Sequence, residues 1–116
     1  MITPYTAQQT INDFGLIFSN LEYSASIAAS TDTTFVVPDK AQRYKAVITV
    51  KNNTWIAKNA AAAIPAGATF ALTNSKLITA GTTICREVKS GDILHFFSPT
   101  AATDIGIELY AMGTNN

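Results

Sequence analysis

The residue types that most often carry chemistry are scarce in this chain of 116 residues. It has one histidine, His95, and one cysteine, Cys85. A metal site needs several converging ligands, usually more than one histidine together with a carboxylate. Nothing beside His95 supplies them, since the residues two positions away on its strand are Ile93 and Phe97. We therefore expect neither a metal nor another cofactor. We expect His95 to be a strand residue with one ring nitrogen satisfied by a hydrogen bond.

The sequence also gives no indication of a catalytic site. A nucleophile must be paired with a base and an orienting group. Cys85 and His95 flank a predicted turn at 89–92, but they are not directly opposite one another across it, and Cys85 fits a small buried hydrophobe better than a reactive thiol. Glu87 and Glu108 fall on outward strand positions, where a solvated charge is the ordinary state. We expect no catalytic residues and no enzyme.

Aromatic residues leave carbohydrate binding open as an alternative. Tyr44 and Trp55 lie on neighbouring predicted strands. If both rings are exposed on one face, they form the flat platform on which a sugar stacks; if they are buried, they are core or interface residues. The location of Trp55 distinguishes these two interpretations.

Composition narrows the class of partner. The chain is 47% hydrophobic and only 14% charged, with a net charge of zero and no block of like charge. We therefore expect neither nucleic acid nor anionic lipid as a partner. No apolar stretch approaches the roughly 20 residues that cross a bilayer, and the N-terminus lacks a basic region followed by an apolar core. A charge-poor surface is typical of proteins covered by partners, and it favours a homo-oligomer, either a dimer or a trimer.

The elements that must position these residues are β-strands. Apolar residues alternate with polar ones in several short stretches that turn residues separate. The predicted strands are 33–37, 44–51, 54–58, 69–73, 82–88, 93–98 and 105–112. We expect 44–51 and 54–58 to form a hairpin at Asn52-Asn53, and the last three strands to form an antiparallel meander that turns at Gly91. The alanine-rich stretch 59–68 is predicted to be a loop, because Pro65 and Gly67 interrupt it.

This pattern indicates an all-β fold. Seven or eight short strands without a convincing helix are typical of a two-sheet antiparallel sandwich of jelly-roll type. Residues 32–116 are predicted to form that sandwich, and the less regular residues 1–31 to form an N-terminal arm or edge segment. The apolar residues of this segment are the candidate partner contacts: Phe14, Leu16, Ile17, Phe18 and Tyr23. They belong either to an arm that packs on a partner or to the first strand of the sandwich.

Three segments carry a resemblance to a known class of protein. Phe35–Asp39 reads FVVPD, Asn53–Ala57 reads NTWIA, and Val88–Phe96 reads VKSGDILHF. In this order, with an Ala/Pro/Gly loop between the second and the third, residues 33–110 resemble small virion structural proteins of tailed bacteriophages. The matching residues form strands and turns and carry no chemistry.

The resemblance implies a capsid cement or decoration protein with a jelly-roll fold. Such a protein would be synthesised in the host cytoplasm and would sit on the exterior of the virion, where it would bind across subunits of the major capsid protein and stabilise the mature shell. The alternative function, carbohydrate binding by Tyr44 and Trp55, then corresponds to a module of a phage fibre or tail component.

Overall fold

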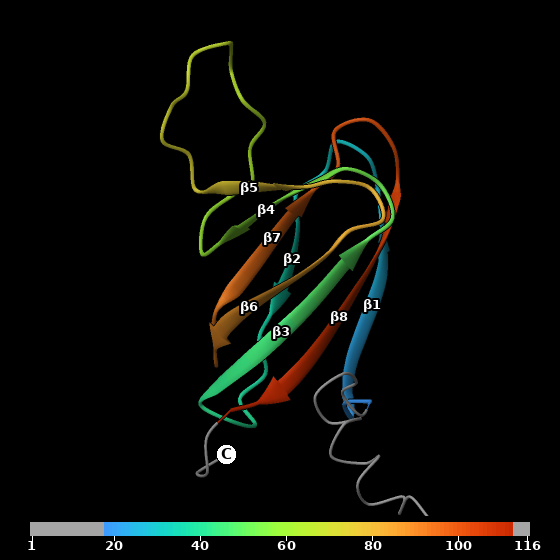
Figure 1. Ribbon diagram of the computed structural model, residues 1–116, viewed down its shortest axis with the longest axis vertical. Coiled ribbons are helices and arrows are strands. Elements are labelled where there is room, and N and C mark those ends of the chain that lie inside the picture. The colour runs from blue at the N-terminus through green and yellow to red at the C-terminus, as the bar shows by residue number, and fades with distance from the viewer. Residues whose placement is uncertain (1–17, 113–116) are drawn as a thin grey trace, which may run out of the picture.

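The computed structural model describes residues 18–112, which form eight β-strands and no helix. The strands make two antiparallel four-stranded sheets that pack face to face (Figure 1). Sheet A has the strand order β1-β8-β3-β6, and sheet B has the order β2-β7-β4-β5. The strands are β1 (Leu21–Ile27), β2 (Thr33–Val36), β3 (Arg43–Val50), β4 (Thr54–Lys58), β5 (Ser75–Ile78), β6 (Thr83–Lys89), β7 (Ile93–Phe97) and β8 (Thr103–Ala111).

The strand pairing is that of a jelly roll. β1 pairs with β8, β2 with β7, β3 with β6 and β4 with β5, so each pair is nested inside the one before it. Pairing of β3 with β8 and of β4 with β7 then completes the two sheets. The predicted all-β, two-sheet sandwich is confirmed, and this nesting gives it the predicted jelly-roll topology.

The core lies between the sheets and follows the alternation of the strands. On β3, every second residue from Tyr44 to Val50 is buried, and on β8 the same holds from Thr103 to Leu109. Sheet B contributes Ile56, Ile78, Leu94 and Phe96. The buried Tyr44 hydroxyl donates a hydrogen bond to the carbonyl of Pro38 and accepts one from the N–H of Lys40, both at 2.9 Å, so its polar end is satisfied inside the protein.

The predicted hairpin and meander are wrong, although their strands exist. β3 belongs to sheet A and β4 to sheet B, and the connection between them is held by β8: the Lys51 N–H donates to the carbonyl of Asp104 and the Asn52 N–H donates to the Thr103 hydroxyl. β6, β7 and β8 likewise alternate between the sheets. A period of two shows which side of a strand faces the core, but it does not show which strand lies beside it.

The predicted strand 69–73 is also absent. The chain between β4 and β5, residues 59–74, is a loop that projects from one end of the sandwich (Figure 1). The pairing of β4 with β5 ends at Ala57 and Ser75. Residues 69–73 therefore lie beyond the end of β4, where no neighbouring strand is available to complete their backbone hydrogen bonds.

The start of the described chain is a strand of the sandwich. β1 pairs with β8 over all of its residues, and Ile27 is buried in the core. The boundary predicted at residue 31 is therefore not a boundary of the fold, and residues 21–27 correspond to the edge-strand interpretation. Residues 1–17 and 113–116 lie outside the described part of the chain.

Candidate docking surfaces

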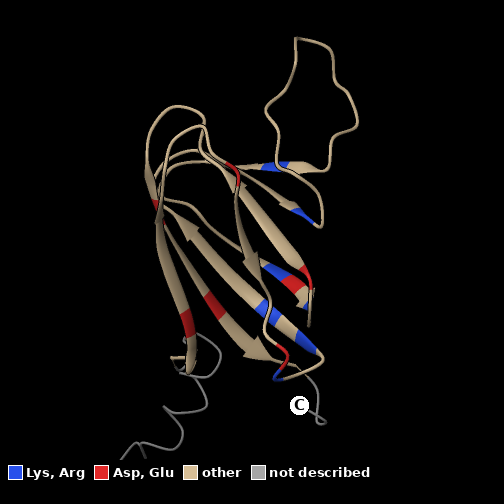
Figure 2. Cartoon of the chain, turned by 180° about the vertical axis from the view of Figure 1, so that it is seen from behind, with Lys and Arg blue, Asp and Glu red and all other residues tan. Residues whose placement is uncertain are grey.

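The outer face of sheet A is polar. Its outward positions on β1, β8, β3 and β6 alternate with the core residues and carry most of the charges of the strands (Figure 2). The charged residues are Glu22, Arg43, Lys45, Glu87, Lys89, Asp104 and Glu108. Arg43 and Glu87 form an exposed ion pair at 2.9 Å. This is the polar, solvated face that an antiparallel sheet normally presents to water.

The outer face of sheet B is different, because none of its outward strand positions is charged. The strand register brings together Thr34, Val36, Trp55, Ala57, Ser75, Leu77, Ile93, His95 and Phe97. Val36 is 59% exposed, Leu77 39% and Ile93 37%, while Trp55 and Phe97 are half-buried. We call this set the sheet B face. Its exposed apolar side chains are those of Val36, Leu77 and Ile93, whereas Ala57 on the same face is only 3% exposed.

The loop 59–74 leaves this face from a firmly held base. Asn59, in a left-handed backbone conformation with φ of 60°, donates its N–H to the carbonyl of Ile93 at 2.7 Å and accepts the Ile93 N–H on its side chain at 2.8 Å. The Ala62 N–H donates to Asp32 at 3.4 Å, and the Ala63 N–H donates to the Ser75 hydroxyl at 3.0 Å. These bonds tie the first limb of the loop to sheet B.

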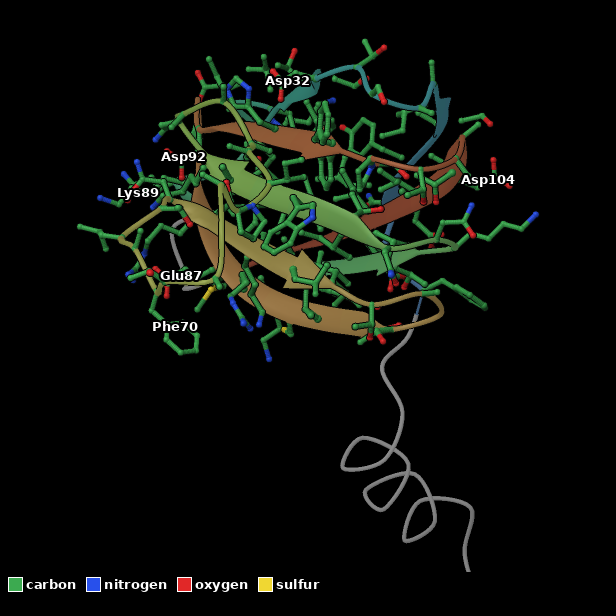
Figure 3. All side chains as sticks on the ribbon, turned by 90° about the horizontal axis from the view of Figure 1, so that it is seen from above. Asp32, Phe70, Glu87, Lys89, Asp92 and Asp104 are labelled. Carbon is green, nitrogen blue, oxygen red and sulfur yellow. The ribbon has the colours of Figure 1, made fainter. Side chains whose placement is uncertain are left out.

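The far part of the loop exposes its apolar residues. Phe70 and Leu72 are fully exposed, and Ile64 is about half exposed. Figure 3 shows Phe70 standing away from the ribbon of the sandwich. Exposing two such side chains to water is unfavourable by roughly 25 cal/mol per Å² of apolar surface. The loop therefore combines an anchored base with an apolar end.

His95 and Asp32 join the sheet to this loop. The Nδ1 atom of His95 lies 2.8 Å from the carboxylate of Asp32, and because a carboxylate only accepts, Nδ1 carries the hydrogen. The other oxygen of Asp32 accepts the Ala62 N–H. The prediction of a strand histidine with a bonded ring nitrogen is confirmed, and Asp32 links this ring to the loop. No group of three or more potential metal ligands occurs within residues 18–112.

Asp92 holds the turn beside the loop base. Gly91 has a φ of 86°, which a side chain rarely tolerates, and the carboxylate that follows accepts the Lys89 N–H at 2.9 Å. Its other oxygen accepts from the Asn59 side chain at 3.3 Å, and Lys58 lies 4.0 Å away. Burial acts to raise the pKa of Asp92, but these hydrogen bonds together with the charges of Lys58 and Lys89 lower it overall.

An acidic pair marks sheet A. Glu22 on β1 and Glu108 on β8 are direct cross-strand partners. Loss of hydration, a hydrogen bond with Glu108 and the charge of Glu108 all raise the pKa of Glu22. Loss of hydration and a hydrogen bond with Glu108 raise the pKa of Tyr110 as well. A shallow hollow of about 290 Å³ lies beside the pair, over Gly106, whose missing side chain leaves open space. Like charges directly opposite one another weaken a sheet, so the pair is costly at neutral pH.

The predicted partner contacts separate into three groups. Phe14, Leu16 and Ile17 lie outside the described residues. Phe18, just before β1, is 89% exposed. Tyr23 points inward instead and packs on Phe35 with the ring centroids 4.9 Å apart, so it fills the edge of the core.

The predicted sugar platform does not form. Tyr44 is fully buried on the inner side of sheet A, and its ring offers no face to a ligand. Trp55 lies half-buried on the sheet B face beside Phe97 and Leu77. The two aromatic residues thus belong to opposite sheets, and one partner of the predicted pair is unavailable.

Cys85 corrects another expectation. It is exposed on the outer side of β6, so it is not the small buried hydrophobe that its apolar neighbour suggested. Alternation along β6 puts Cys85 on the other face of the strand from Ile84 and Val88, which face the core. Cys85 is exposed because β6 is an edge strand of sheet A and its outer face is covered by no other element of the described chain.

No helix long and apolar enough to cross a membrane occurs within residues 18–112.

Sequence reasoning missed the residues that the structure exposes most. The alternation of residues 69–73 predicts a strand for Phe70 and Leu72, and nothing in the sequence marks Val36, Leu77 and Ile93 as surface residues. The available indication was the position of Phe70 and Leu72 after Pro65 and Gly67, in a stretch free of charge. Comparisons with protein-family models, with curated proteins and with solved structures find no match to this chain.

Proposed function

We propose that the chain is a non-enzymatic virion structural protein, a capsid decoration protein that binds across subunits of the major capsid protein on the particle exterior. One observation carries the proposal: large apolar side chains are exposed at opposite ends of a charge-poor sandwich. Phe18 lies at the end where β1 begins, and Phe70 and Leu72 lie on the loop at the other end (Figure 1).

Two separated contacts are what a cement protein requires. A domain with one adhesive end attaches to one neighbour, whereas a domain with two ends spans a seam between neighbours. The rigid sandwich between Phe18 and the loop fixes the spacing of the two contacts, and the bonds at Asn59 and Ala62 fix the base of the loop. A contact whose base is already ordered loses less conformational entropy when it docks.

The mechanism is adhesive. If both ends are satisfied only when subunits have their mature spacing, the protein binds the mature shell more tightly than its precursor. Binding one state in preference to another stabilises that state by mass action. The resemblance of the segments Phe35–Asp39, Asn53–Ala57 and Val88–Phe96 to virion proteins of tailed bacteriophages supports this assignment of the partner.

The test is co-sedimentation with purified particles of the phage that encodes the chain, both mature capsids and precursor shells. Wild type should bind mature capsids and raise the temperature at which they release DNA. The variant Phe70→Ser/Leu72→Ser should bind at least tenfold more weakly, because burial of one large apolar side chain contributes about 1.5–3 kcal/mol. Phe18→Ser should weaken binding independently of the loop variant.

The matched control is Thr69→Ser/Thr73→Ser, which changes the same loop without changing its apolar residues. It should bind as wild type does. Failure of wild type to bind any particle, or equal binding by the Phe70→Ser/Leu72→Ser variant, would contradict the proposal. Retention on a glycan array in place of particles would favour carbohydrate binding around Trp55.

A further inference from the structure

Three basic residues occupy positions where alternation along a strand calls for core residues. Lys58 on β4, Lys76 on β5 and Arg86 on β6 each fall on the side of their strand that faces the other sheet. Their cross-strand partners are all buried in the core: Leu94, Ile56 and Ala46, respectively. Every other lysine, arginine, aspartate and glutamate of the eight strands lies on the outer face of sheet A. The three cations are therefore exceptions to the pattern that forms the sandwich.

These cations line one groove. It opens between β5, an edge strand of sheet B, and β6, an edge strand of sheet A, and has a volume of about 240 Å³. Apolar side chains from both sheets also line it: Ile48, Ile56, Ile84, Val88 and Leu94. The acidic residue of the lining, Glu87, is already paired with Arg43 at 2.9 Å. The groove thus combines an apolar interior with an excess of positive charge.

The opposite side of the sandwich shows that the fold does not require such charges. There, between β1 and β2, a hollow of about 170 Å³ is lined by uncharged residues. Tyr23 packs on Phe35 at this side, with the ring centroids 4.9 Å apart, and the two rings pack against the core. Uncharged side chains are sufficient at one edge between the sheets, so packing alone does not account for the cations at the other edge.

The cations of the groove have few partners within residues 18–112. Lys58 lies 4.0 Å from the Asp92 carboxylate, whereas Lys76 and Arg86 form no ion pair with another described residue. The Nη1 atom of Arg86 donates to the carbonyl of Cys85 at 2.9 Å. A guanidinium has five N–H donors, so Arg86 retains the capacity to bind an anion. Three like charges beside one groove repel one another, and a carboxylate placed among them would relieve this repulsion.

The backbone of β6 offers a second means of binding. The Ser90 N–H donates to the carbonyl of Gln42 just beyond the pairing of β6 with β3. Residues of an antiparallel pair alternate between bonded and non-bonded positions, so the register turns the backbone groups of Thr83, Cys85 and Glu87 away from β3. No strand formed by the described residues pairs with β6 on that side. An extended segment of another protein can therefore form hydrogen bonds along this edge.

We propose that β6 binds an extended acidic segment of a partner protein, which adds a strand to sheet A and places a carboxylate in the groove. Alternate side chains of the added strand face the groove. An acidic residue opposite Arg86 would lie among the three cations, and apolar residues two positions to either side would lie beside Ile84 and Val88. The recognised pattern is therefore apolar, any residue, acidic, any residue, apolar.

Charge selects this partner over a second copy of the chain. If two β6 strands paired with each other, the groove cations of both copies would be brought together and would repel one another. Inward-pointing charges protect an edge strand from such self-pairing. A segment that carries a carboxylate meets the opposite situation, because its charge forms hydrogen bonds to lysine and arginine that are stronger than those between neutral groups.

The experiment titrates the free full-length protein, labelled with ¹⁵N, with the peptide TVTETVT, which is acetylated and amidated at its ends. Backbone amide shifts, followed up to about 2 mM peptide, give the dissociation constant and the place of binding. The shifts should concentrate on β6 and β5. The peptide TVTQTVT should bind at least tenfold more weakly at low salt, because it lacks the charge, and this gap should narrow in about 1 M salt.

Two further changes separate the contributions of charge and backbone. Lys76→Gln/Arg86→Gln should weaken binding of TVTETVT at least tenfold. Its matched control, Lys45→Gln/Lys51→Gln, removes the same charge from residues outside the groove lining and should bind within about twofold of wild type at moderate salt. N-methylation of the two threonines that flank the glutamate should abolish binding, because it removes the N–H groups that would face β6 in an antiparallel pair. Thermal melts show whether the variants are folded.

Four outcomes would overturn the inference. They are the absence of shifts on β6 up to the highest peptide concentration, equal binding of TVTETVT and TVTQTVT, undiminished binding of the N-methylated peptide, and equal losses in the Lys76→Gln/Arg86→Gln and Lys45→Gln/Lys51→Gln variants. Decanoate that shifts the groove residues in a protein that binds no peptide would assign the groove to a small amphiphile and overturn the inference as well.

This inference is independent of the proposed function. Peptide binding is measured on the free protein, and particle binding is measured with the Phe18 and Phe70/Leu72 variants. A chain that binds TVTETVT but no particle contradicts only the proposed function. A chain that binds particles but no acidic peptide contradicts only the inference about β6.

Discussion

The two sheets of this protein have equivalent inner faces and dissimilar outer faces. Inside, both sheets contribute buried aliphatic and aromatic residues to one core, such as Ile48 and Leu109 from sheet A and Ile56 and Phe96 from sheet B. Outside, sheet A carries an ion pair and an acidic pair, while the strands of sheet B carry no outward charge.

The difference separates the requirements of folding from those of binding. The fold needs an apolar core between the sheets, and both sheets contribute to it. The outer sides are then free to differ. A charged outer face interacts favourably with water, and an uncharged apolar face carries little desolvation cost when a partner covers it. Four predictions test this division, from the largest expected effect to the smallest.

The first prediction compares the loss of stability on truncating a buried apolar residue with the loss on truncating an exposed one. Leu109→Ala removes a leucine that is 1% exposed in the core and should lower the free energy of unfolding by about 2–5 kcal/mol. Leu77→Ala on the sheet B face should cost less than about 1 kcal/mol, because Leu77 already contacts water. Urea denaturation of the dilute protein measures both. Equal losses would show that Leu77 belongs to the core.

The second concerns Asp92, which secures the loop base. Asp92→Asn should lower the free energy of unfolding by about 1–2 kcal/mol at neutral pH, because it weakens charge-assisted hydrogen bonds. The pKa of Asp92 is lowered in the folded protein, so this stability is present above the unfolded-state pKa and is lost as pH falls through the folded-state pKa.

Urea denaturation of wild type and Asp92→Asn from neutral to acid pH should therefore show two curves that converge at low pH. Asp104→Asn is the control, because Asp104 is exposed on sheet A and accepts one hydrogen bond from Ser26. A gap between wild type and Asp92→Asn that stays constant down to the lowest pH would contradict the role given to the carboxylate.

The third prediction compares the effect of removing the charge of two acids of sheet A on the melting temperature. The pKa of Glu22 is raised, so its contribution to stability is fully present below the unfolded-state pKa and is lost as pH rises through the folded-state pKa. Glu22→Gln should therefore raise the melting temperature at neutral pH, and the gain should shrink in acid and in 1 M salt.

Glu87→Gln is the contrasting change, since it breaks the exposed ion pair with Arg43 and should leave the melting temperature unchanged or slightly lower. Scanning calorimetry at two pH values measures both variants. A lower melting temperature for Glu22→Gln at neutral pH would show that the Glu22–Glu108 pair is not repulsive.

The fourth prediction is the smallest in energy. Cys85→Ser on the solvated face should change the free energy of unfolding by less than about 0.5 kcal/mol. In the folded wild type, a thiol reagent should label Cys85 without the delay that global unfolding imposes. Labelling only under denaturing conditions would place Cys85 in the core.

The strands were predictable because alternation is a local property. The inward sets of β3 and β8, including Ala46, Ile48, Ile105 and Ile107, could be identified in sequence, since only one side of each strand is continuously apolar. The turn at Gly91 was also predictable, because it needs a positive φ. Strand number and the absence of a helical period were enough to indicate a jelly roll.

Strand partnership was not predictable, because it depends on contacts between residues far apart in the chain. Lys51 and Asn52 are held by β8, about fifty residues away, and this sends β4 to the other sheet. The same limit applies to the candidate surfaces. Phe70 and Leu72 alternate as a strand does, but β4 ends before it can pair with them.

The sequence by itself determined the fold class, the inward face of most strands and the scarcity of catalytic residue types, because each follows from residue identity and spacing along the chain. Only the tertiary structure decided that Tyr44 is buried, that Cys85 is exposed, that His95 meets Asp32, and that the apolar outward residues of β2, β7, β4 and β5 share one face. The physical reason is that backbone hydrogen bonds between strands distant in sequence set the neighbours of each outward side chain, and alternation along one strand carries no information about them.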